Sequence, residues 1–229
     1  MNDWEKAADM PTALVTGASR GIGREFVRQY RAAGWRVIAT CRDPAASDLD
    51  GDVLPLDVAD PAGVAALGRS LVAETIDLLI NNAGISGPRG YSVGSIPFDA
   101  WEQVLRTNTL GPLRVAEALL DAVARSDRRL MVFLTSGLGS ITQGGGGYYL
   151  YGSSKAALNK AVKSLSVDLR PRGVGCLLFH PGWVHTDMGG PSAPVSVEAS
   201  VRGMRKVIQG WSMARTGAFV DYTGTAIPW

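Results

Sequence analysis

Residues 16–23 read Thr-Gly-Ala-Ser-Arg-Gly-Ile-Gly, and they join a short apolar run, Ala13–Val15, to an amphipathic segment, Ile22–Ala33. The first pattern is typical of a buried strand and the second of a helix. Glycines in such a turn permit positive φ angles and let the backbone approach a pyrophosphate, while the helix N-terminus offers free N–H groups. The turn therefore predicts a dinucleotide-binding unit, and Gly17, Ser19, Arg20, Gly21, Ile22 and Gly23 are its candidate cofactor contacts.

The alternation of strand-like and helical segments continues to the end of the chain. Further short apolar runs predict strands at Val37–Ala39, Val53–Leu56, Leu78–Ile80, Leu130–Leu134, Gly175–Phe179 and Ala218–Val220. Helical periodicity recurs at Ala62–Ala73, Trp101–Ala124, Tyr151–Arg170 and Val197–Gln209. Such alternation favours right-handed crossovers. Because no linker divides the chain, we expect residues 1–229 to form a single doubly wound α/β Rossmann domain, its seven-stranded, mainly parallel sheet flanked by helices.

Composition narrows the classes of partner. The net charge is only +2 and there is no basic run, so neither nucleic acid nor an anionic membrane surface is expected. No apolar run reaches the roughly 18 residues of a membrane span. The first residues, Met-Asn-Asp-Trp-Glu-Lys, lack the apolar region of a signal peptide, which predicts a cytoplasmic protein. Cys41 and Cys176 lie far apart in apolar runs, so they are interpreted as small core residues and no metal site is expected.

A second candidate site lies at the start of the segment Tyr151–Arg170. Of the three neighbouring tyrosines 148, 149 and 151, only Tyr151 is followed four residues later by a lysine, Lys155. On a helix these two side chains share a face. A fixed ammonium favours the phenolate, so we expect Lys155 to lower the pKa of Tyr151 from about 10 towards the range useful for proton transfer.

Taken together, these motifs resemble the short-chain dehydrogenase/reductase superfamily over nearly the whole chain. The spacing Gly-x-x-x-Gly-x-Gly after Thr16 and the Tyr-x-x-x-Lys of Tyr151 and Lys155 carry the resemblance. The segment Tyr151–Asp168 and the end, Asp221–Trp229, are similar to the sniffer/C-factor-like branch, whose members are implicated in carbonyl reduction or developmental signalling.

The resemblance implies a catalytic tetrad of Asn108, Ser136, Tyr151 and Lys155. Ser136 begins a Ser-x-x-Gly match, although its separation from Tyr151 is slightly longer than usual; Leu138 stands at the usual spacing and cannot donate a hydrogen bond, and Ser140 is the alternative. Asn108 begins an Asn-x-x-Gly match inside a predicted helix, where the family's Asn interrupts the helix and holds a water that links the lysine to solvent. A tolerated polar residue is the other interpretation of Asn108.

By the same resemblance, three more segments contact the cofactor, together with Tyr151 and Lys155, whose ammonium can also bond the nicotinamide ribose hydroxyls. The family places an adenine-edge contact at Asp57 and Val58, although Asp57 could instead cap the next segment. Asn82, Ala83 and Gly84 belong to the Asn-Asn-Ala-Gly motif, which stabilises the sheet and lines the cofactor. In the Pro-Gly turn, Val184 is expected to offer its backbone and Thr186 its hydroxyl to the nicotinamide. The turn's predicted contacts are Pro181, Gly182, Val184 and Thr186.

The choice of dinucleotide depends on two arginines. NAD-specific proteins place an acidic residue after the second strand to bind the ribose hydroxyls, but here Thr40 and Cys41 are followed by Arg42. Arg42 and Arg20 together suit a 2′-phosphate, because guanidinium binds phosphate oxygens bidentately. We therefore predict NADP(H) as cofactor. Arg42 could instead be a surface residue paired with Asp43, which would leave NAD or mixed use open.

These observations predict an NADP(H)-dependent carbonyl reductase acting on a small-molecule carbonyl or alcohol, and the family implies a homodimer. The substrate is expected between residues 85–98 and 188–197, with Trp183 and Met188 as apolar walls or as packing residues. His180 and His185 are interpreted as packing and solvent-exposed residues, although His185 could meet substrate. The alternative function is a cofactor-binding signalling or regulatory protein with incidental turnover.

Overall fold

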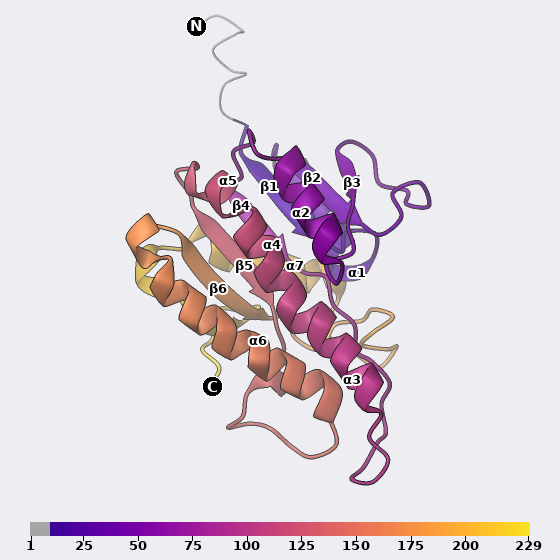
Figure 1. Cartoon of the computed structure of the whole chain (residues 1–229). Helices are drawn as coiled ribbons and strands as arrows, with labels where there is room; N and C mark the ends of the chain where they lie inside the picture. Colours follow the sequence, from indigo (N-terminus) through magenta and orange to yellow (C-terminus); the bar gives the residue numbers. More distant parts are fainter. Residues whose placement is uncertain (1–9) are drawn as a thin grey trace, which may run out of the picture.

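The computed structural model describes residues 10–229, so the N-terminal segment interpreted above lies outside the described residues. Seven strands form one sheet in the order β3-β2-β1-β4-β5-β6-β7, and every neighbouring pair is parallel (Figure 1). The strands are β1 (Thr12–Thr16), β2 (Arg36–Cys41), β3 (Val53–Pro55), β4 (Leu78–Asn81), β5 (Leu130–Leu134), β6 (Gly175–His180) and β7 (Ala218–Asp221). The predicted doubly wound α/β fold is confirmed. Its strand order reverses between β1 and β4, which opens a crevice at their carboxyl ends.

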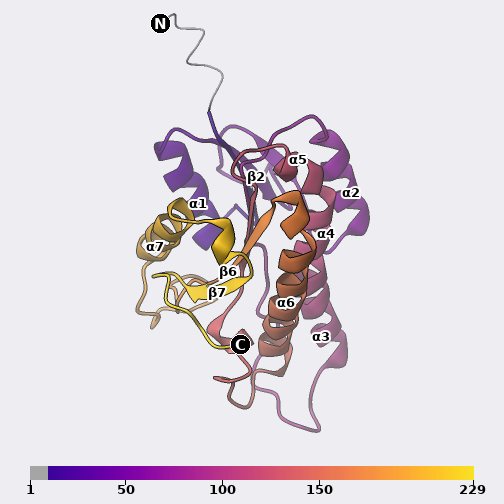
Figure 2. The same ribbon diagram turned by 90° about the vertical axis from the view of Figure 1, so that its left-hand side faces the viewer.

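Helices cover both faces of this sheet (Figure 2). One face carries α1 (Gly21–Ala32) and α7 (Val197–Gln209). The other carries α2 (Pro61–Ser70), α3 (Phe98–Leu105), α4 (Gly111–Ala118), α5 (Leu120–Ala124) and α6 (Tyr149–Asp168). Within the second layer α4 packs on α2, and α3 packs on α6.

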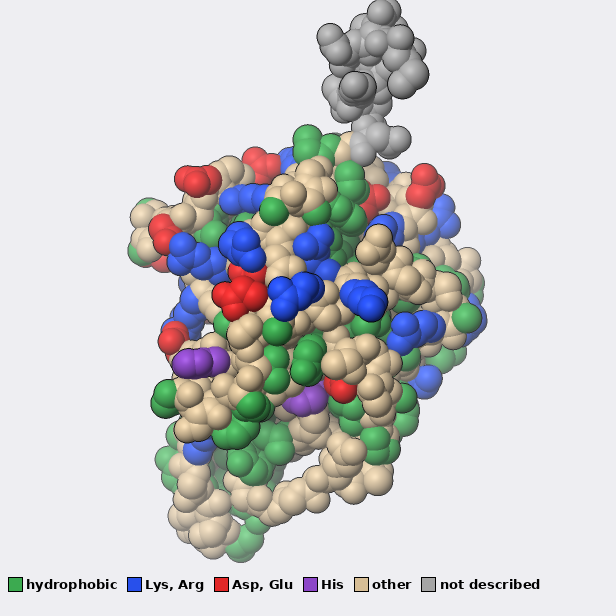
Figure 3. Space-filling model, turned by 180° about the vertical axis from the view of Figure 1, so that it is seen from behind, with side chains coloured by type: hydrophobic (Ala, Val, Ile, Leu, Met, Phe, Trp, Pro, Cys, Tyr) green, Lys and Arg blue, Asp and Glu red, His purple; other side chains and the backbone are tan. Residues whose placement is uncertain are grey.

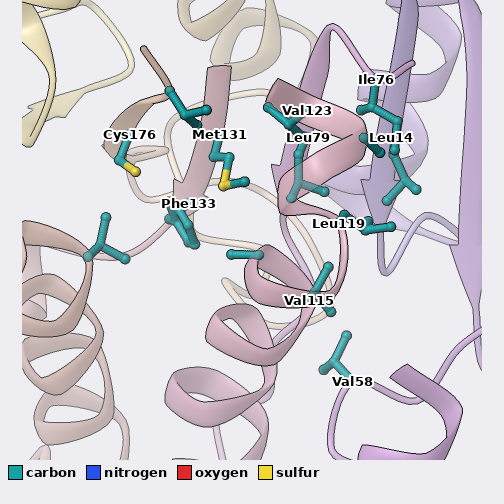
Figure 4. Close-up of a cluster of buried hydrophobic side chains, with 14 of the residues drawn as sticks. Leu14, Val58, Ile76, Leu79, Val115, Leu119, Val123, Met131, Phe133 and Cys176 are labelled. Atoms are coloured by element: carbon teal, nitrogen blue, oxygen red, sulfur yellow. The ribbon is translucent and has the colours of Figure 1, made fainter. Parts of the chain in front are cut away.

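Each face of the sheet has its own apolar core. Under α1 and α7, Phe26 and Met204 pack against strand residues such as Val15 and Leu177. On the opposite face, Leu14, Leu79 and Phe133 point from the strands towards Val115 and Leu119 of the α4–α5 region (Figure 4). Strand residues buried on both faces explain why the strands have no polar alternation in sequence. Cys41 and Cys176 are buried free thiols.

The segment Trp101–Ala124, predicted as one helix, is divided in the structure. A single π-helical turn, Arg106–Leu110, separates α3 from α4, and the chain breaks again at Leu119 before α5. Pro112 explains part of this, because it has no N–H to donate to the carbonyl of Asn108 four residues earlier. The remaining cause is the Asn108 side chain, which is bonded outside the helix, as described below.

The described residues contain neither a membrane-spanning helix nor a cluster of metal-binding side chains. Between residues 10 and 229, no helix has both the length and the apolar character to cross a bilayer. Across the same range, no group of three or more His, Cys, Asp or Glu side chains is arranged to hold a metal ion.

Candidate active site

A cavity of about 530 Å³ lies where the carboxyl ends of the central strands meet. Its wall combines residues from the glycine turn, the loops after β4 and β5, the start of α6 and the segment after β6; among them are Ile22, Arg89, Ser136, Tyr151, Trp183 and Thr186. Figure 3 shows the face that carries α1 and α7, with charged side chains gathered over its upper part and mainly hydrophobic or uncharged ones around a hollow in its lower part. The fold thus brings both predicted motif groups to one place.

The glycine turn is built for close backbone approach. Gly17 has a φ of +65°, and a Cβ there would lie 2.9 Å from the Cα of Ala83. A Cβ on Gly23 would lie 2.3 Å from the carbonyl oxygen of Gly17. The N-terminus of α1 has no side-chain cap, unlike those of α2 and α7, which Asp60 and Ser196 cap. Open N–H groups at this helix end, beside a turn with no room for side chains, fit the phosphates of a dinucleotide.

The Asn-Asn-Ala-Gly segment holds this turn in place. The Asn82 side chain donates hydrogen bonds to the carbonyl oxygens of Thr16 and Gly17, at 2.9 and 3.0 Å. In return, the Thr16 hydroxyl accepts from the backbone N–H groups of Asn82 and Ala83. These bonds account for the predicted structural role of the motif, because they link β1 to β4 at the edge of the crevice.

The segment after β6 closes the other side of the crevice. Gly182 has a φ of +87°, and the Thr186 hydroxyl donates to the carbonyl of Val184 at 3.3 Å. A Cβ built on Gly21 would lie 3.4 Å from the Thr186 methyl group, so the two predicted cofactor segments converge. Val184 is largely buried and contributes to the cavity lining.

Ser136 follows the end of β5, and Tyr151 lies in the first turn of α6. Both side chains line the cavity. Ser136 also accepts from the N–H of Leu138, which starts a short 3₁₀ turn that takes up part of the longer spacing to Tyr151. Ser140, the alternative, is buried and accepts a hydrogen bond from the N–H of Gln143. The geometry therefore favours Ser136.

Lys155 lies beside Tyr151, as expected for two side chains on one helix face, and it is buried. Its Nζ is 5.7 Å from the centre of the Tyr151 ring and donates to the carbonyl oxygen of Leu134 at 2.9 Å. Burial lowers the pKa of Lys155 to about 8. Burial also raises the pKa of Tyr151, with the Ser136 hydroxyl and the charge of Arg89 acting in the opposite direction. The prediction of a lowered Tyr151 pKa is wrong here, because desolvation outweighs the neighbouring groups.

Asn108 occupies the π turn and is fully buried. Its amide nitrogen donates to the Ile85 carbonyl at 2.8 Å and to the Ser154 hydroxyl at 3.0 Å, while its oxygen accepts from the N–H of Ile85 at 2.9 Å. A Cβ on Gly84 would lie 3.2 Å from the Asn108 oxygen and 3.6 Å from the Nζ of Lys155. Asn108 is thus a built-in part of the site, joining the loop after β4 to α6, rather than a tolerated polar residue.

The residues predicted to bind the adenosine end of the cofactor differ in their hydrogen-bond and ion-pair partners. Arg42 is exposed, and within residues 10–229 it forms no ion pair with Asp43, whose carboxylate accepts from the N–H of Ala46. Arg20 is paired at 2.9 Å with Asp187 across the crevice. The Asp57 carboxylate accepts from the N–H of Ala59.

Val58 lies next to Asp57 and differs from it in burial. Its side chain is buried in the core, and a Cβ on Gly111 would lie 3.0 Å from the carbonyl oxygen of Val58.

Sequence patterns missed several residues at the site. Arg89 lines the cavity and donates to the Met188 carbonyl at 2.9 Å, bridging the two expected substrate loops. His180 also lines the cavity; burial lowers its pKa, Asp221 acts the other way, and its Nδ1 has no hydrogen-bond partner among the described residues. The position of His180 at the carboxyl end of a predicted strand could have indicated that it lies at the site. Arg89 gave no such signal, because its partner Met188 is distant in sequence. Trp183 and Met188 lie in the wall as expected, and His185 is exposed.

Comparison with known proteins agrees with this geometry. The model of the short chain dehydrogenase family matches residues 11–195. The chain is 44% identical over 165 residues to the "C-signal" protein of Myxococcus xanthus, covering 72% of this chain and 99% of that protein. The solved carbonyl reductase Sniffer of D. melanogaster superposes with a TM-score of 0.90 at 32% identity, covering 96% of this chain and all of that one. The NADPH-bound carbonyl reductase from chicken fatty liver superposes with a TM-score of 0.84 at 34% identity, covering 96% and 99%.

Proposed function

Because the chain belongs to the short chain dehydrogenase family, we propose that it is an NADP(H)-dependent carbonyl reductase acting on a small-molecule carbonyl or alcohol. One observation carries the proposal: Ser136 and Tyr151 line the same cavity as Ile22 and Thr186 of the predicted cofactor segments. A bound nicotinamide cofactor supplies hydride to the carbonyl carbon.

The protein's own residues then act on the carbonyl oxygen. Ser136 and Tyr151 donate hydrogen bonds to this oxygen as it gains negative charge. A raised pKa keeps the Tyr151 phenol protonated at neutral pH, so the residue starts reduction as a proton donor. Lys155, buried next to Tyr151 and beside Asn108, supports replacement of that proton.

The preference for NADP(H) rests on charge around the crevice. Arg20 and Arg42 provide two guanidinium groups near the glycine turn and the end of β2, where a ribose 2′-phosphate is expected. That the chicken carbonyl reductase is NADPH-bound supports the same choice. The glycine turn, Asp57 and Val58, residues 82–84 and the segment Pro181–Thr186 complete the proposed cofactor site.

The mechanism is tested by Tyr151→Phe, which removes only the phenolic oxygen. We expect kcat for carbonyl reduction to fall by about 10²–10⁴-fold, the range for loss of a general acid. NADPH binding, followed by the change in cofactor fluorescence, should stay within a few-fold of the wild type. Tyr148→Phe, the same change on an exposed neighbour in the cavity wall, is the matched control. Full residual activity of Tyr151→Phe would exclude the mechanism.

A second candidate function has one observation in its favour. The Myxococcus xanthus relative is named C-signal, which supports a signalling or regulatory protein with incidental turnover. A panel of aldehydes, ketones and quinones with NADPH separates the two. Tight NADPH binding without turnover of any member would favour the signalling role.

Three further properties are part of the proposal. Residues 1–229 form one domain, the protein is cytoplasmic, and two copies pair through the outer faces of the α4 and α6 region. The small residues Ala156, Ala157 and Ala161 and the exposed Leu110 and Val167 support close helix packing there. Sedimentation velocity distinguishes a dimer from a monomer.

A further inference from the structure

We propose that Arg89 selects substrates that carry a carboxylate, so that the preferred substrate is an oxo acid with an apolar or aromatic body. The inference rests on the proposed reductase function and names its substrate class. The cavity wall carries very few charged side chains. Among the described lining residues, Arg89 is the only Arg or Lys, and none is Asp or Glu. The other titratable base, His180, has a pKa lowered by burial and is therefore neutral at pH 7.

The position of Arg89 ties it to the reacting group. Arg89 and Tyr151 line the same cavity of about 530 Å³, and the positive charge of Arg89 lowers the pKa of Tyr151 against the larger effect of burial. A ligand held by Tyr151 therefore lies within the electrostatic reach of the guanidinium. A substrate carboxylate at Arg89 would orient the molecule while its carbonyl group meets Ser136 and Tyr151.

The guanidinium also has unused donors. It makes one hydrogen bond, to the backbone carbonyl of Met188, and no ion pair with any residue from 10 to 229. Guanidinium has five N–H donors in a planar fork that matches a carboxylate. The bond to Met188 fixes one edge of the group and leaves the others for a ligand.

The other side chains of the cavity wall favour a substrate with an apolar or aromatic body. Its large side chains include Tyr91, Leu138, Tyr148, Trp183 and Met188. Aromatic and aliphatic walls with a small number of fixed polar groups are typical of small-molecule sites, in which the polar groups set orientation. The cavity of about 530 Å³ is shared with the cofactor segments, so the substrate itself is small.

The test compares substrates that differ only in charge. The wild type is assayed with NADPH on 4-carboxybenzaldehyde and on its methyl ester, and on several further acid–ester pairs of aromatic and aliphatic ketones. We expect kcat/KM to be higher for the acids, mainly through KM. In Arg89→Gln, the acid-to-ester ratio of kcat/KM should fall by about ten- to hundredfold, as expected when a charge-assisted hydrogen bond is lost.

Controls separate charge recognition from loop support. Loss of the Met188 contact alone would slow acid and ester equally and leave their ratio unchanged. Arg89→Lys should recover part of the preference for acids. Arg69→Gln, the same charge change on the exposed side of α2, should leave the ratio and NADPH binding at wild-type values.

The outcomes also separate this inference from the proposed function. Turnover of the esters with an acid-to-ester ratio that Arg89→Gln does not change would overturn the role of Arg89 and leave the reductase assignment intact. Lack of turnover of every pair would overturn both. A matched aldehyde that carries a phosphate monoester, if preferred over the carboxylate in an Arg89-dependent manner, would overturn the choice of carboxylate.

Discussion

At the scale of single residues, Tyr151 and Lys155 show how burial sets the starting protonation of the site. Desolvation disfavours both charged forms, raising the pKa of the phenol and lowering that of the ammonium to about 8. The spacing of the pair could be read from the sequence. The depth of burial and the bond from Lys155 to the Leu134 carbonyl could not, because both depend on β5 packing under α6.

The same burial makes Lys155 a pH-dependent cost to folding. The folded protein releases this proton at about 8 and the unfolded chain near 10.5, so between these values the unfolded state binds more protons. The free energy of unfolding should therefore rise with pH across this window, and below it the cost of burying the charge is fully present. Urea unfolding without cofactor, compared between wild type and Lys155→Met, isolates this slope. Equal slopes in both proteins would contradict the prediction, and the exposed Lys160→Met is the control.

Substitutions at Arg42 and Asp187 should change the affinity for NADPH in opposite directions. Arg42→Ala should raise the Kd for NADPH about tenfold or more and change that for NADH little, because only NADPH carries the 2′-phosphate. Asp187→Asn should lower the Kd for NADPH, since it releases Arg20 from its ion pair. Titrations of cofactor fluorescence measure both, with the exposed Arg170→Ala as control. Equal effects of Arg42→Ala on the two cofactors would show that the phosphate assignment is wrong.

At the scale of elements, the contact between the glycine turn and α1 leaves no room for an added side chain. Gly23→Ala would place a Cβ 2.3 Å from the Gly17 carbonyl oxygen and 2.5 Å from the Asn82 amide nitrogen. Such overpacking costs about 1–3 kcal/mol or more, and here it also displaces the proposed phosphate site. We expect a lower Tm together with weaker NADPH binding. Gly145→Ala, whose Cβ meets nothing within 4 Å, should retain both values, and a wild-type Tm for Gly23→Ala would contradict the close packing.

Element boundaries were predicted well where local patterns determine them. The strands and α1, α6 and α7 follow from apolar periodicity in the sequence. The region 101–124 was not predicted in detail, because its periodicity is helical on both sides of the π turn. Asn108 and Pro112 are the only local signs of that turn, and the bonds that hold it, to Ile85 and Ser154, join residues far apart in sequence.

At the scale of the whole molecule, strand–helix alternation was sufficient to predict the α/β class and the crevice. It could place the motifs at one edge of the sheet, because parallel strands end on the same side. The alternation could not predict the contacts across the crevice, because their partners are far apart in sequence. Arg20 and Asp187 are separated by 167 positions, and Arg89 and Met188 by 99. Exposed charged residues on loops carry no periodicity, so only the folded arrangement reveals their partners.

The π turn at Arg106–Leu110 acts as a phase shift within one long helical rod. One extra residue in a turn rotates the following segment by about 100° relative to a continuous α-helix. The segment before the shift can therefore face α6 while the segment after it faces α2. A single extra residue thus lets α3 pack on α6 and α4 pack on α2. Asn108, whose side chain lies beside Lys155 in the active site, is part of this turn.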